Sequence, residues 1–407
     1  MKRSILVIAD GRSPITLRWL EALNKLNFEI SLVSTYPVEK STPVKTIRVM
    51  PLGFTGLVSG AAETGEKRKS ASWKRNLRRL IQIARPLVFK IRAILGPLTL
   101  PKYEKELKSL IEEIKPDIVH ALRIPYEGML ARVTPADIPL VVSVWGNDFT
   151  LHANASVRMK RLTKEAMQRA NGLLADVERD ILLGRQWGFS TQKTALVVPG
   201  GGGIHFEEIE AAKQTNPSGI DFQSHDPVII NPRGIRAYAR SDVFFKAIPL
   251  VLERFPRALF LCVAMKDQAE ALHWYRHYNL EKNVLLLPLI SQAELWSLFH
   301  RSQISVSITT HDGTPNTLIE AMACGCFPIA GDIESIREWI TPWVNGLLVP
   351  PDNHEALARA IIKTVENTEL LNNARVINRK LLLQKADANL ILQKLKLFYD
   401  DLMNPDS

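Results

Sequence analysis

The sequence predicts an α/β protein made of two doubly wound halves, each a parallel sheet with helices on both faces. Short apolar runs of strand length alternate along the chain with amphipathic stretches of helical period. The alternation occurs twice, before and after the glycine cluster at 200–203. A length of 407 residues also fits two or three domains, at roughly 150 residues per domain.

The first half contains strands and helices in the order expected of βαβ units. The run Ser4–Ala9 is almost wholly apolar, as in a strand that is covered on both faces. Ser13 and Pro14 fit the cap and the first position of the next helix. Further strands are expected at 28–34, 117–121, 140–144, 172–175 and 194–198, and further helices at 103–115 and 157–170. This order predicts parallel strands with crossover helices.

A polar stretch separates the glycine cluster from the second alternation. Strands are expected at 228–231, 258–264, 284–287, 304–309 and 326–330, and helices at 242–255 and 353–363. Ser291 and Glu294 form a capping box for another helix, and Thr314 and Pro315 fit the N-cap and first position of one more. Ligands of such sheets bind beyond the carboxyl ends of the strands, so a cleft between the halves is the expected site.

The composition excludes several classes of protein. Apolar residues make up 46% and charged residues 23%, as in ordinary globular proteins, which excludes global disorder, a collagen-like fibre and a disulfide scaffold. No apolar run is long enough to span a membrane. The first ten residues suit a buried strand better than a signal peptide. Three cysteines without metal-site spacing favour a cytoplasmic location.

The net charge of +10 is concentrated in one segment. Residues 67–102 contain eleven basic residues and no acidic one, so the rest of the chain is close to neutral. Apolar residues from Trp73 to Ile91 recur there at helical spacing, with cations mostly on the remaining faces. Such a helix suits an anionic membrane surface; the alternative is a solvated helix packed on its own domain. Nucleic acid is not an expected partner, because no nucleic-acid module accompanies the segment.

The segment 309–330 carries the clearest functional pattern. The dipeptide Asp312–Gly313 turns the chain into a helix that would present the backbone N–H groups of Asn316, Thr317 and Leu318. Such an N-terminus can bind a diphosphate. Glu320 lies one turn further on the same face and can accept hydrogen bonds from two hydroxyl groups, as from a ribose. Asp312 can reach another part of the same ligand.

The chain resembles the retaining glycosyltransferases of family 4, the group 1 transferases, in its donor-site signature. The residues that carry the signature are Asp312–Gly313, Glu320–Ala323, Gly325 and Pro328–Ala330, followed by Glu338 and Asn345–Val349. The segments 116–120, 145–148 and 199–204 resemble landmarks of the family's acceptor-side half. The resemblance covers nearly the whole chain and implies the GT-B fold, two Rossmann-like domains that face each other across a cleft.

The GT-B resemblance also implies a domain organisation. Residues 1–203 would form the acceptor-binding domain, including the basic segment 67–102, and residues 204–385 would form the nucleotide-sugar-binding domain. The C-terminal helix, 386–407, is expected to pack back toward the N-terminal domain.

In the family, an arginine and a lysine neutralise the donor diphosphate. The candidates here are Arg233, Arg236 and Arg240, with Arg240 at the position where the lysine usually stands. Arginine at that position would give a permanent, bidentate phosphate partner. We expect Arg236 and Arg240 to form the pair, with Arg233 as the substitute.

On the acceptor side, Gly11 and Arg12 stand where many relatives have a glycine-rich loop. His120 and Asp148 follow predicted strands and join Asp312 and Glu320 as candidate catalytic residues. The alternatives are that His120 is a satisfied core histidine and that Asp148 only holds a loop.

The resemblance implies a retaining glycosyltransferase that moves a hexosyl or similar unit from a nucleotide-sugar donor to a hydroxyl group. The acceptor would be a glycan or a lipid-linked molecule in the synthesis of cell-surface polysaccharide or glycolipid. No cofactor and no metal are expected, and no Asp-x-Asp occurs in the chain. The expected location is the cytoplasm, with peripheral attachment to the inner face of the membrane as the further option.

Other functions remain open at this stage. A sugar-nucleotide epimerase shares the fold, and a catalytically silent protein that binds nucleotide-sugars would keep the same donor pattern. A dinucleotide oxidoreductase is disfavoured, because no Gly-x-Gly-x-x-Gly follows the first strand.

Overall fold

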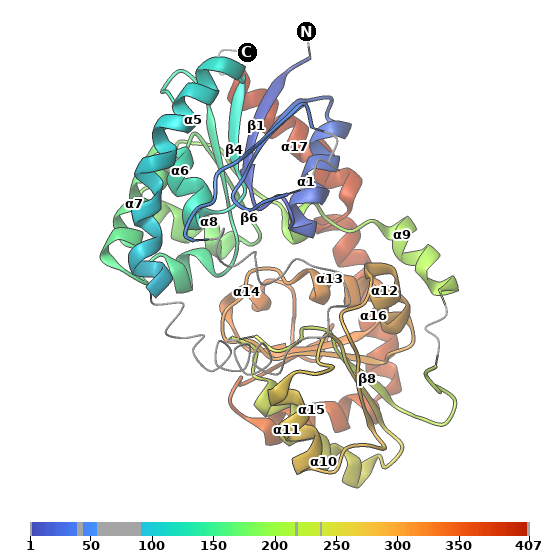
Figure 1. Cartoon of the computed structure of the whole chain (residues 1–407). Helices are drawn as coiled ribbons and strands as arrows, with labels where there is room; N and C mark the ends of the chain where they lie inside the picture. The colour runs from blue at the N-terminus through green and yellow to red at the C-terminus, as the bar shows by residue number, and fades with distance from the viewer. Residues whose placement is uncertain (1, 39–43, 55–90, 216–218, 237, 405–407) are drawn as a thin grey trace. The chain divides into compact units, whose positions relative to one another are not determined.

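The computed structural model describes residues 2–38, 44–54, 91–215, 219–236 and 238–404, and these form two compact units (Figure 1). The N-terminal unit consists of residues 1–202 and 392–407, and the C-terminal unit of residues 203–391. The chain therefore passes from one unit to the other twice, once within the glycine cluster and once inside the last helix. Most of the basic segment, and with it the expected amphipathic helix, lies outside the described residues.

The N-terminal unit is built on a seven-stranded parallel sheet with the strand order β3-β2-β1-β4-β5-β6-β7. The strands are β1 (Ser4–Ala9), β2 (Glu29–Ser34), β3 (Thr46–Val49), β4 (Ile118–Ala121), β5 (Leu140–Val144), β6 (Gly172–Ala175) and β7 (Ala195–Val197). From β1 the chain runs outward through β2 and β3, and it returns to β4 on the other side of β1. The predicted parallel sheet is confirmed, and β3 is a strand that the sequence analysis did not predict.

Helices connect these strands. They are α1 (Pro14–Lys25), α5 (Leu100–Ile114), α6 (Met129–Ala131), α7 (Val157–Arg169) and α8 (Glu178–Gln186), with the last turns of α17 (Ala388–Met403). The amphipathic spacing of α1 places Leu20 and Leu23 in the interior. Helix α5 ends where Lys115 adopts a left-handed conformation before Pro116, because the residue that precedes a proline is disfavoured in the helical region.

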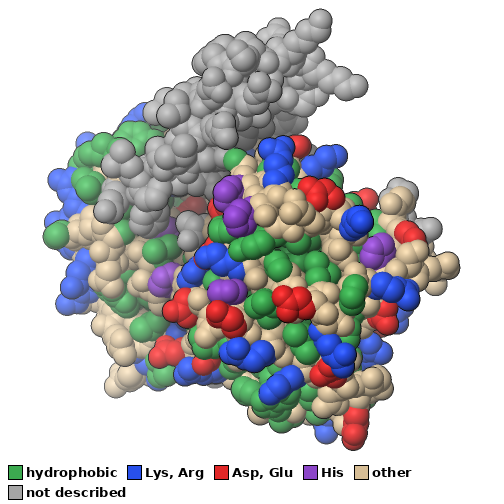
Figure 2. Space-filling model, turned by 90° about the horizontal axis from the view of Figure 1, so that it is seen from below, with side chains coloured by type: hydrophobic (Ala, Val, Ile, Leu, Met, Phe, Trp, Pro, Cys, Tyr) green, Lys and Arg blue, Asp and Glu red, His purple; other side chains and the backbone are tan. Residues whose placement is uncertain are grey.

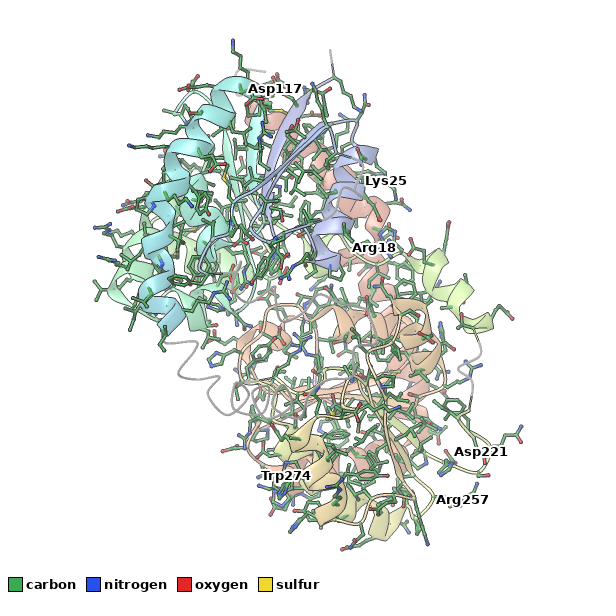
Figure 3. The ribbon with its side chains drawn as sticks, in the orientation of Figure 1. Arg18, Lys25, Asp117, Asp221, Arg257 and Trp274 are labelled. Carbon is green, nitrogen blue, oxygen red and sulfur yellow. The ribbon has the colours of Figure 1, made fainter. Side chains whose placement is uncertain are left out.

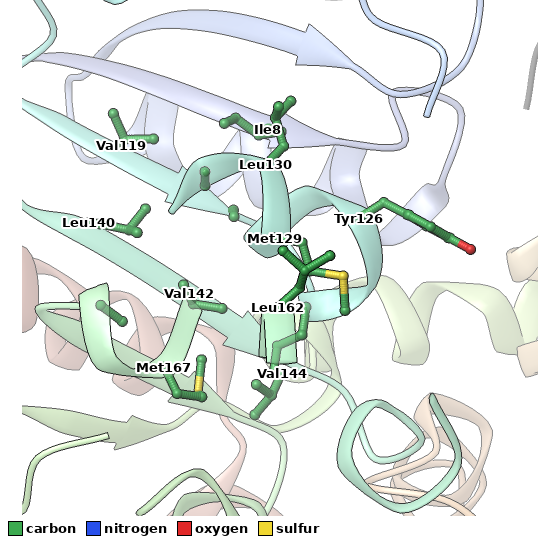
Figure 4. Packing of buried hydrophobic residues seen from close by; sticks show 14 of the residues in the cluster. Ile8, Val119, Tyr126, Met129, Leu130, Leu140, Val142, Val144, Leu162 and Met167 are labelled. Carbon is green, nitrogen blue, oxygen red and sulfur yellow. The ribbon is translucent and has the colours of Figure 1, made fainter. Parts of the chain in front are cut away.

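The core of the N-terminal unit lies between the sheet and these helices. Side chains from β1, β4 and β5 pack against α6 and α7, as Figure 4 shows around Val142 and Met129. At the amino ends of β1 and β4, the carboxylate of Asp117 accepts a hydrogen bond from the Ser4 amide across 2.6 Å (Figure 3). The C-terminal residues belong to this core, since Tyr399 is buried and its ring packs edge-on against Phe28.

The C-terminal unit has a six-stranded parallel sheet with the order β10-β9-β8-β11-β12-β13. The strands are β8 (Val228–Asn231), β9 (Leu259–Cys262), β10 (Val284–Leu286), β11 (Ile304–Ser307), β12 (Phe327–Gly331) and β13 (Leu347–Val349). The helices are α9 (Phe206–Ala211), α10 (Ser241–Arg254), α11 (Ala269–His277), α12 (Gln292–His300), α13 (Asn316–Ala323), α14 (Glu334–Arg337), α15 (His354–Val365) and α16 (Thr368–Lys385). The predicted capping box of Ser291 and Glu294 opens α12.

The surface agrees with the charge distribution in the sequence. Lys and Arg side chains are interspersed with Asp and Glu over the face shown in Figure 2, as expected if the excess positive charge resides in the basic segment. Within the described ranges, every helix is too short or too polar to cross a bilayer.

Candidate functional site

The C-terminal unit has its topological switch point between β8 and β11. From β8 the chain continues to β9 and β10 on one side, and it returns to β11 on the other side. Open α/β sheets bind ligands outside the carboxyl ends of the strands at this point. The loops that follow β8 and β11 are joined there by an antiparallel bridge between Ala239 and Thr309. These loops and the start of α13 contain most of the predicted donor-side residues.

Arg233 and Asp312 connect the two loops directly. Arg233 Nη2 donates to Asp312 Oδ2 across 2.7 Å, with side chains that are only 9% and 14% exposed. The Nε atom of Arg233 is buried and has no hydrogen-bond partner. A buried donor without an acceptor is costly, about 1–3 kcal/mol, and therefore calls for an explanation. An oxygen atom of a bound ligand would supply the acceptor.

The start of α13 differs from the prediction at its cap. The N-cap residue is Pro315, and no side chain caps the helix. Thr314 was the predicted cap, but its hydroxyl oxygen instead accepts a hydrogen bond from Trp339 Nε1 across 2.8 Å. Because no side chain occupies the first turn, its backbone donors are left for another acceptor.

The set of available amides is also smaller than predicted. The Leu318 amide donates to the Pro315 carbonyl across 2.9 Å, so the expectation that this amide is unpaired was wrong. Asn316 and Thr317 contribute the remaining amides of the first turn. The Thr317 hydroxyl oxygen is buried without a hydrogen-bond partner, which adds a second unsatisfied group to this loop.

Glu320 follows one turn later on α13 and is 7% exposed. Its Oε1 atom accepts a hydrogen bond from Gln292 Nε2, at the start of α12, across 2.8 Å. The Gly313 amide donates to Asp312 Oδ1 across 3.2 Å, which fixes the turn before the helix. The structure thus brings the two acids, the turn and the first helical amides together in one short segment.

The three candidate arginines have different surroundings in the structure. Arg236 is exposed, and its Nε donates to the Arg233 carbonyl while Nη1 donates to Tyr238 Oη. Arg240 forms a bidentate ion pair with Asp242, at 2.8 and 2.9 Å, and this hydrogen bonding lowers the pKa of the Asp242 carboxyl. Arg233, the substitute in the sequence analysis, is therefore the arginine whose side chain is built into the switch point.

The N-terminal unit has its own switch point, between β1 and β4. The Gly11 amide, just after β1, donates to Ser34 Oγ across 3.1 Å. A Cβ atom on Gly11 would lie only 2.8 Å from that oxygen, so the close approach requires glycine. Arg12 forms an ion pair with Asp10, and its guanidinium carbon lies 3.7 Å from the centre of the Tyr36 ring.

His120 lies inside the N-terminal unit, where its side chain is fully buried. Its Nε2 atom is 2.8 Å from Ser143 Oγ, and its Nδ1 atom is 2.8 Å from Tyr399 Oη. Burial lowers the pKa of the imidazole to about 3. Both ring nitrogens are bonded and the side chain has no exposed surface. The alternative that His120 is a satisfied core histidine therefore accounts for it better than a catalytic role.

Asp148 is also fully buried. Its carboxylate accepts hydrogen bonds from Arg123 Nη2 at 2.8 Å, the Ile124 amide at 3.1 Å and the Trp145 amide at 3.2 Å. These contacts tie the loop after β4 to the loop after β5. The geometry agrees with the alternative that Asp148 holds a loop. The ion pair with Asp148 also fixes the position of the Arg123 guanidinium.

Two family models match the chain. Residues 212–381 match the family of glycosyl transferases group 1, and residues 87–176 match the glycosyl transferase 4-like family. The chain thus contains the domains of a group 1 glycosyltransferase. No curated protein sequence is similar enough to this glycosyltransferase to count as a match.

Solved structures of similar fold cover this glycosyltransferase almost completely. The sucrose-phosphate synthase of Thermosynechococcus elongatus has a TM-score of 0.70 at 16% identity, covering 99% of this chain and 100% of its own. Anabaena HepE in complex with UDP has a TM-score of 0.68 at 15% identity, covering 98% and 100%. A glycosyltransferase from Rickettsia africae has a TM-score of 0.66 at 17% identity, covering 100% of both chains. These similarities confirm the GT-B fold.

The N-terminal unit of this glycosyltransferase contains a cavity of about 260 Å³. Its wall includes Asp10, Tyr36, Arg123 and Trp145, which follow β1, β2, β4 and β5 respectively. The cavity therefore opens beyond the carboxyl ends of four strands around the switch point, where a ligand is expected. Sequence reasoning placed acceptor-side residues near this edge but did not predict the cavity.

Glu127 in the cavity wall is one of the residues that sequence reasoning missed. It is 5% exposed, and its Oε1 accepts a hydrogen bond from Thr35 Oγ1 across 2.8 Å. Burial raises the pKa of this carboxyl to about 7, against the opposing effect of the nearby Arg123 charge. The available signal was an acid in a mostly apolar stretch within the loop that follows the buried strand β4.

Replacing Glu127 by glutamine is expected to stabilise the protein at pH 8 but not at pH 4.5. The raised pKa means that the folded state disfavours the ionised carboxyl. The resulting loss of unfolding free energy is absent below about pH 4.5 and grows between about pH 4.5 and pH 7. Above pH 7 it is constant at about 3 kcal/mol. Urea unfolding of Glu127→Gln at both pH values measures it, with the exposed Glu106→Gln as the matched control. Equal effects of Glu127→Gln at the two pH values would contradict the assignment.

Among the described residues, no group of three His, Cys, Asp or Glu side chains is arranged to hold a metal ion. The expectation of a reaction without metal or cofactor stays a prediction.

Proposed function

We propose that this protein is a retaining glycosyltransferase that moves a sugar from a nucleotide-sugar to a hydroxyl group of a glycan or lipid-linked acceptor. The observation that carries the proposal is the switch point of the C-terminal unit. There, Arg233 keeps an unpaired Nε beside Asp312, and α13 begins without a side-chain cap. Cationic and amide donors that converge at a helix N-terminus suit a diphosphate.

Each group of this site has a separate role in donor binding. The Asn316 and Thr317 amides, with the guanidinium of Arg233, would hold the diphosphate. Glu320, buried one turn later, would accept hydrogen bonds from ribose hydroxyls, and Asp312 would orient Arg233 and contact the sugar. Support for a uridine nucleotide comes from HepE, whose structures are described with UDP, with UDP and glucose, and with UDP-glucose.

The proposed chemistry needs positioning and charge stabilisation more than a protein nucleophile. The bond from the anomeric carbon to the diphosphate oxygen breaks, and the acceptor oxygen bonds to the same face of that carbon. The acceptor proton passes to the departing diphosphate, so the anomeric configuration is retained. The negative charge that develops on the leaving group would be stabilised by Arg233 and the α13 amides.

Calorimetric titration of the full chain with UDP, GDP and ADP tests donor binding. We expect one nucleoside diphosphate to bind, and Glu320→Ala to weaken its binding at least tenfold relative to Glu253→Ala, an exposed glutamate on α10 of the same unit. Following a bound nucleotide-sugar by NMR then identifies the reaction. Transfer with the anomeric configuration retained supports the proposal, whereas inversion, conversion of the donor alone to its epimer, or binding without turnover argues against it.

We further propose that the acceptor is reached at an anionic membrane surface. The described residues at the end of the basic segment include the apolar side chains of Ile94 and Leu98, which are 56% and 50% exposed. Lys102 follows on the same segment, so apolar and cationic groups occur together, as membrane-surface binding requires.

Replacing both Ile94 and Leu98 by serine is expected to reduce binding to vesicles that contain anionic lipid by at least fivefold, because buried apolar surface contributes to adsorption. Co-sedimentation with phosphatidylglycerol vesicles measures the effect. The matched control is Leu397→Ser, an exposed leucine on α17 of the same unit. Unchanged sedimentation of the double variant would refute this membrane contact.

A further inference from the structure

The cavity of the N-terminal unit contains a cation that no carboxylate of the described residues neutralises. Arg92 lines the cavity, and among the described residues it has no carboxylate within ion-pair distance. Its Nη2 atom lies 3.5 Å from Tyr36 Oη, and its guanidinium carbon lies 5.1 Å from the centre of the Tyr126 ring. Arginine in this setting keeps most of its five donors for another partner.

Arg123 provides a second guanidinium in the same wall. One of its nitrogens donates to Asp148, while its Nε atom is buried without a partner. Burial, together with the charges of Arg123 and Arg92, lowers the pKa of the neighbouring His152 to about 4. Both guanidiniums therefore lie close to one imidazole, which is neutral at physiological pH.

The carboxylates around the cavity do not balance these charges. Asp10 is paired with Arg12, and Asp148 is paired with Arg123. The remaining acid in the wall is Glu127, whose pKa burial raises to about 7 against the opposing effect of the Thr35 hydrogen bond, so that its carboxyl is only partly ionised near neutral pH. The cavity is left with an excess of positive charge at Arg92, and this charge favours an anionic ligand.

The other side chains of the wall suit a saccharide. The rings of Tyr36, Tyr126 and Trp145 border the cavity and offer apolar surfaces beside polar groups. In Figure 4 the Tyr126 side chain extends away from the other labelled core residues. A volume of about 260 Å³ lies just below the usual range of small-molecule pockets, about 300–1,000 Å³, so the ligand portion held here is small.

We propose that this cavity binds an oxyanion carried by the acceptor, a phosphate or a carboxylate beside sugar hydroxyls, with Arg92 and Arg123 as its cationic contacts. This assignment rests on the proposed function, because it names the chemical class of that acceptor. Arg92 is the residue to test, since Arg123 also holds the Asp148 loop.

The test titrates the full chain with four probes by calorimetry: glucose 6-phosphate, glucuronate, glucose and inorganic phosphate. We expect at least one of the two anionic sugars to bind at least tenfold more tightly than both glucose and inorganic phosphate. A phosphate-bearing acceptor predicts that glucose 6-phosphate binds best, and a carboxylate-bearing acceptor predicts that glucuronate does. Equal binding of charged and neutral sugars would overturn the proposal, as would tighter binding of inorganic phosphate, which would mark an adventitious ion only.

Variants assign the effect to the cavity. Arg92→Gln is expected to abolish the preference for the anionic sugar, Arg92→Lys to keep part of it, and the exposed Arg158→Gln to leave it intact. Retention of the full preference in Arg92→Gln, with an unchanged melting temperature, would overturn the proposal. Titration with UDP distinguishes this inference from the proposed function. If UDP binds but the anionic sugars are not preferred, only this inference is wrong. If the anionic sugars are preferred but no nucleoside diphosphate binds, the proposed donor site is wrong.

Discussion

Arg233→Gln is expected to lower kcat/KM for the nucleotide-sugar by about 10²–10³-fold, the loss typical when one preorganised donor to a developing negative charge is removed. The variant removes a guanidinium at the switch point of the C-terminal unit and, with it, the ion pair between Arg233 and Asp312. Steady-state kinetics with the donor identified by titration measures the loss. The melting temperature of the variant distinguishes this effect from misfolding.

Arg236→Gln is the matched comparison, because it makes the same change three residues later on an exposed side chain. Its effect on kcat/KM is expected to be at least tenfold smaller than that of Arg233→Gln. If Arg236→Gln has the larger effect, the original expectation from the sequence is correct and the assignment of Arg233 to the diphosphate is wrong.

The second large effect concerns acid stability. The folded state keeps His120 neutral to about pH 3, whereas an unfolded chain protonates histidine near its ordinary pKa of about 6.5. The stability due to this depressed pKa is fully present above pH 6.5 and is lost as the pH falls toward 3. A difference of this size corresponds to about 5 kcal/mol. His152, with a pKa of about 4, acts in the same direction, and Glu127 acts in the opposite one.

Urea unfolding of the protein between pH 7 and pH 4 measures this loss. A His120→Gln variant cannot titrate at this position, so its stability is expected to be lower at pH 7 but to fall less steeply with pH. NMR provides an independent observation, since the His120 ring signals of the folded protein are expected not to titrate above pH 4. Titration near pH 6.5 would show that the imidazole is accessible to solvent.

Much of the architecture could be predicted from local patterns. Apolar runs such as Ser4–Ala9 and Leu140–Val144 coincide with the observed strands, because strands buried on both faces require continuous apolar residues. The strand β3 was missed because Thr46–Val49 is short and only partly buried, so its pattern is weak.

The candidate site was predicted less completely, for reasons that depend on tertiary contacts. Thr314 is a residue type that is favoured at N-cap positions, but its hydroxyl group instead bonds to Trp339. Trp339 is distant in the sequence, so no local pattern indicates this contact. The choice among the arginines depends on which side chain turns toward Asp312, and sequence spacing does not determine it. Glu127 acquires its raised pKa from burial, which outweighs the opposing effects of Arg123 and Thr35, and these groups come together only in the folded unit.

The discontinuity of the N-terminal unit has a practical consequence for dissecting the enzyme. Residues 203–391 form one uninterrupted stretch, so a gene fragment with two cut points encodes the whole C-terminal unit. The other unit needs residues 392–407, because Tyr399 closes over the His120 imidazole. A fragment of residues 1–202 alone would lack the segment that contains Tyr399. To express the N-terminal unit by itself, residue 202 should be joined to residue 392 by a short peptide linker.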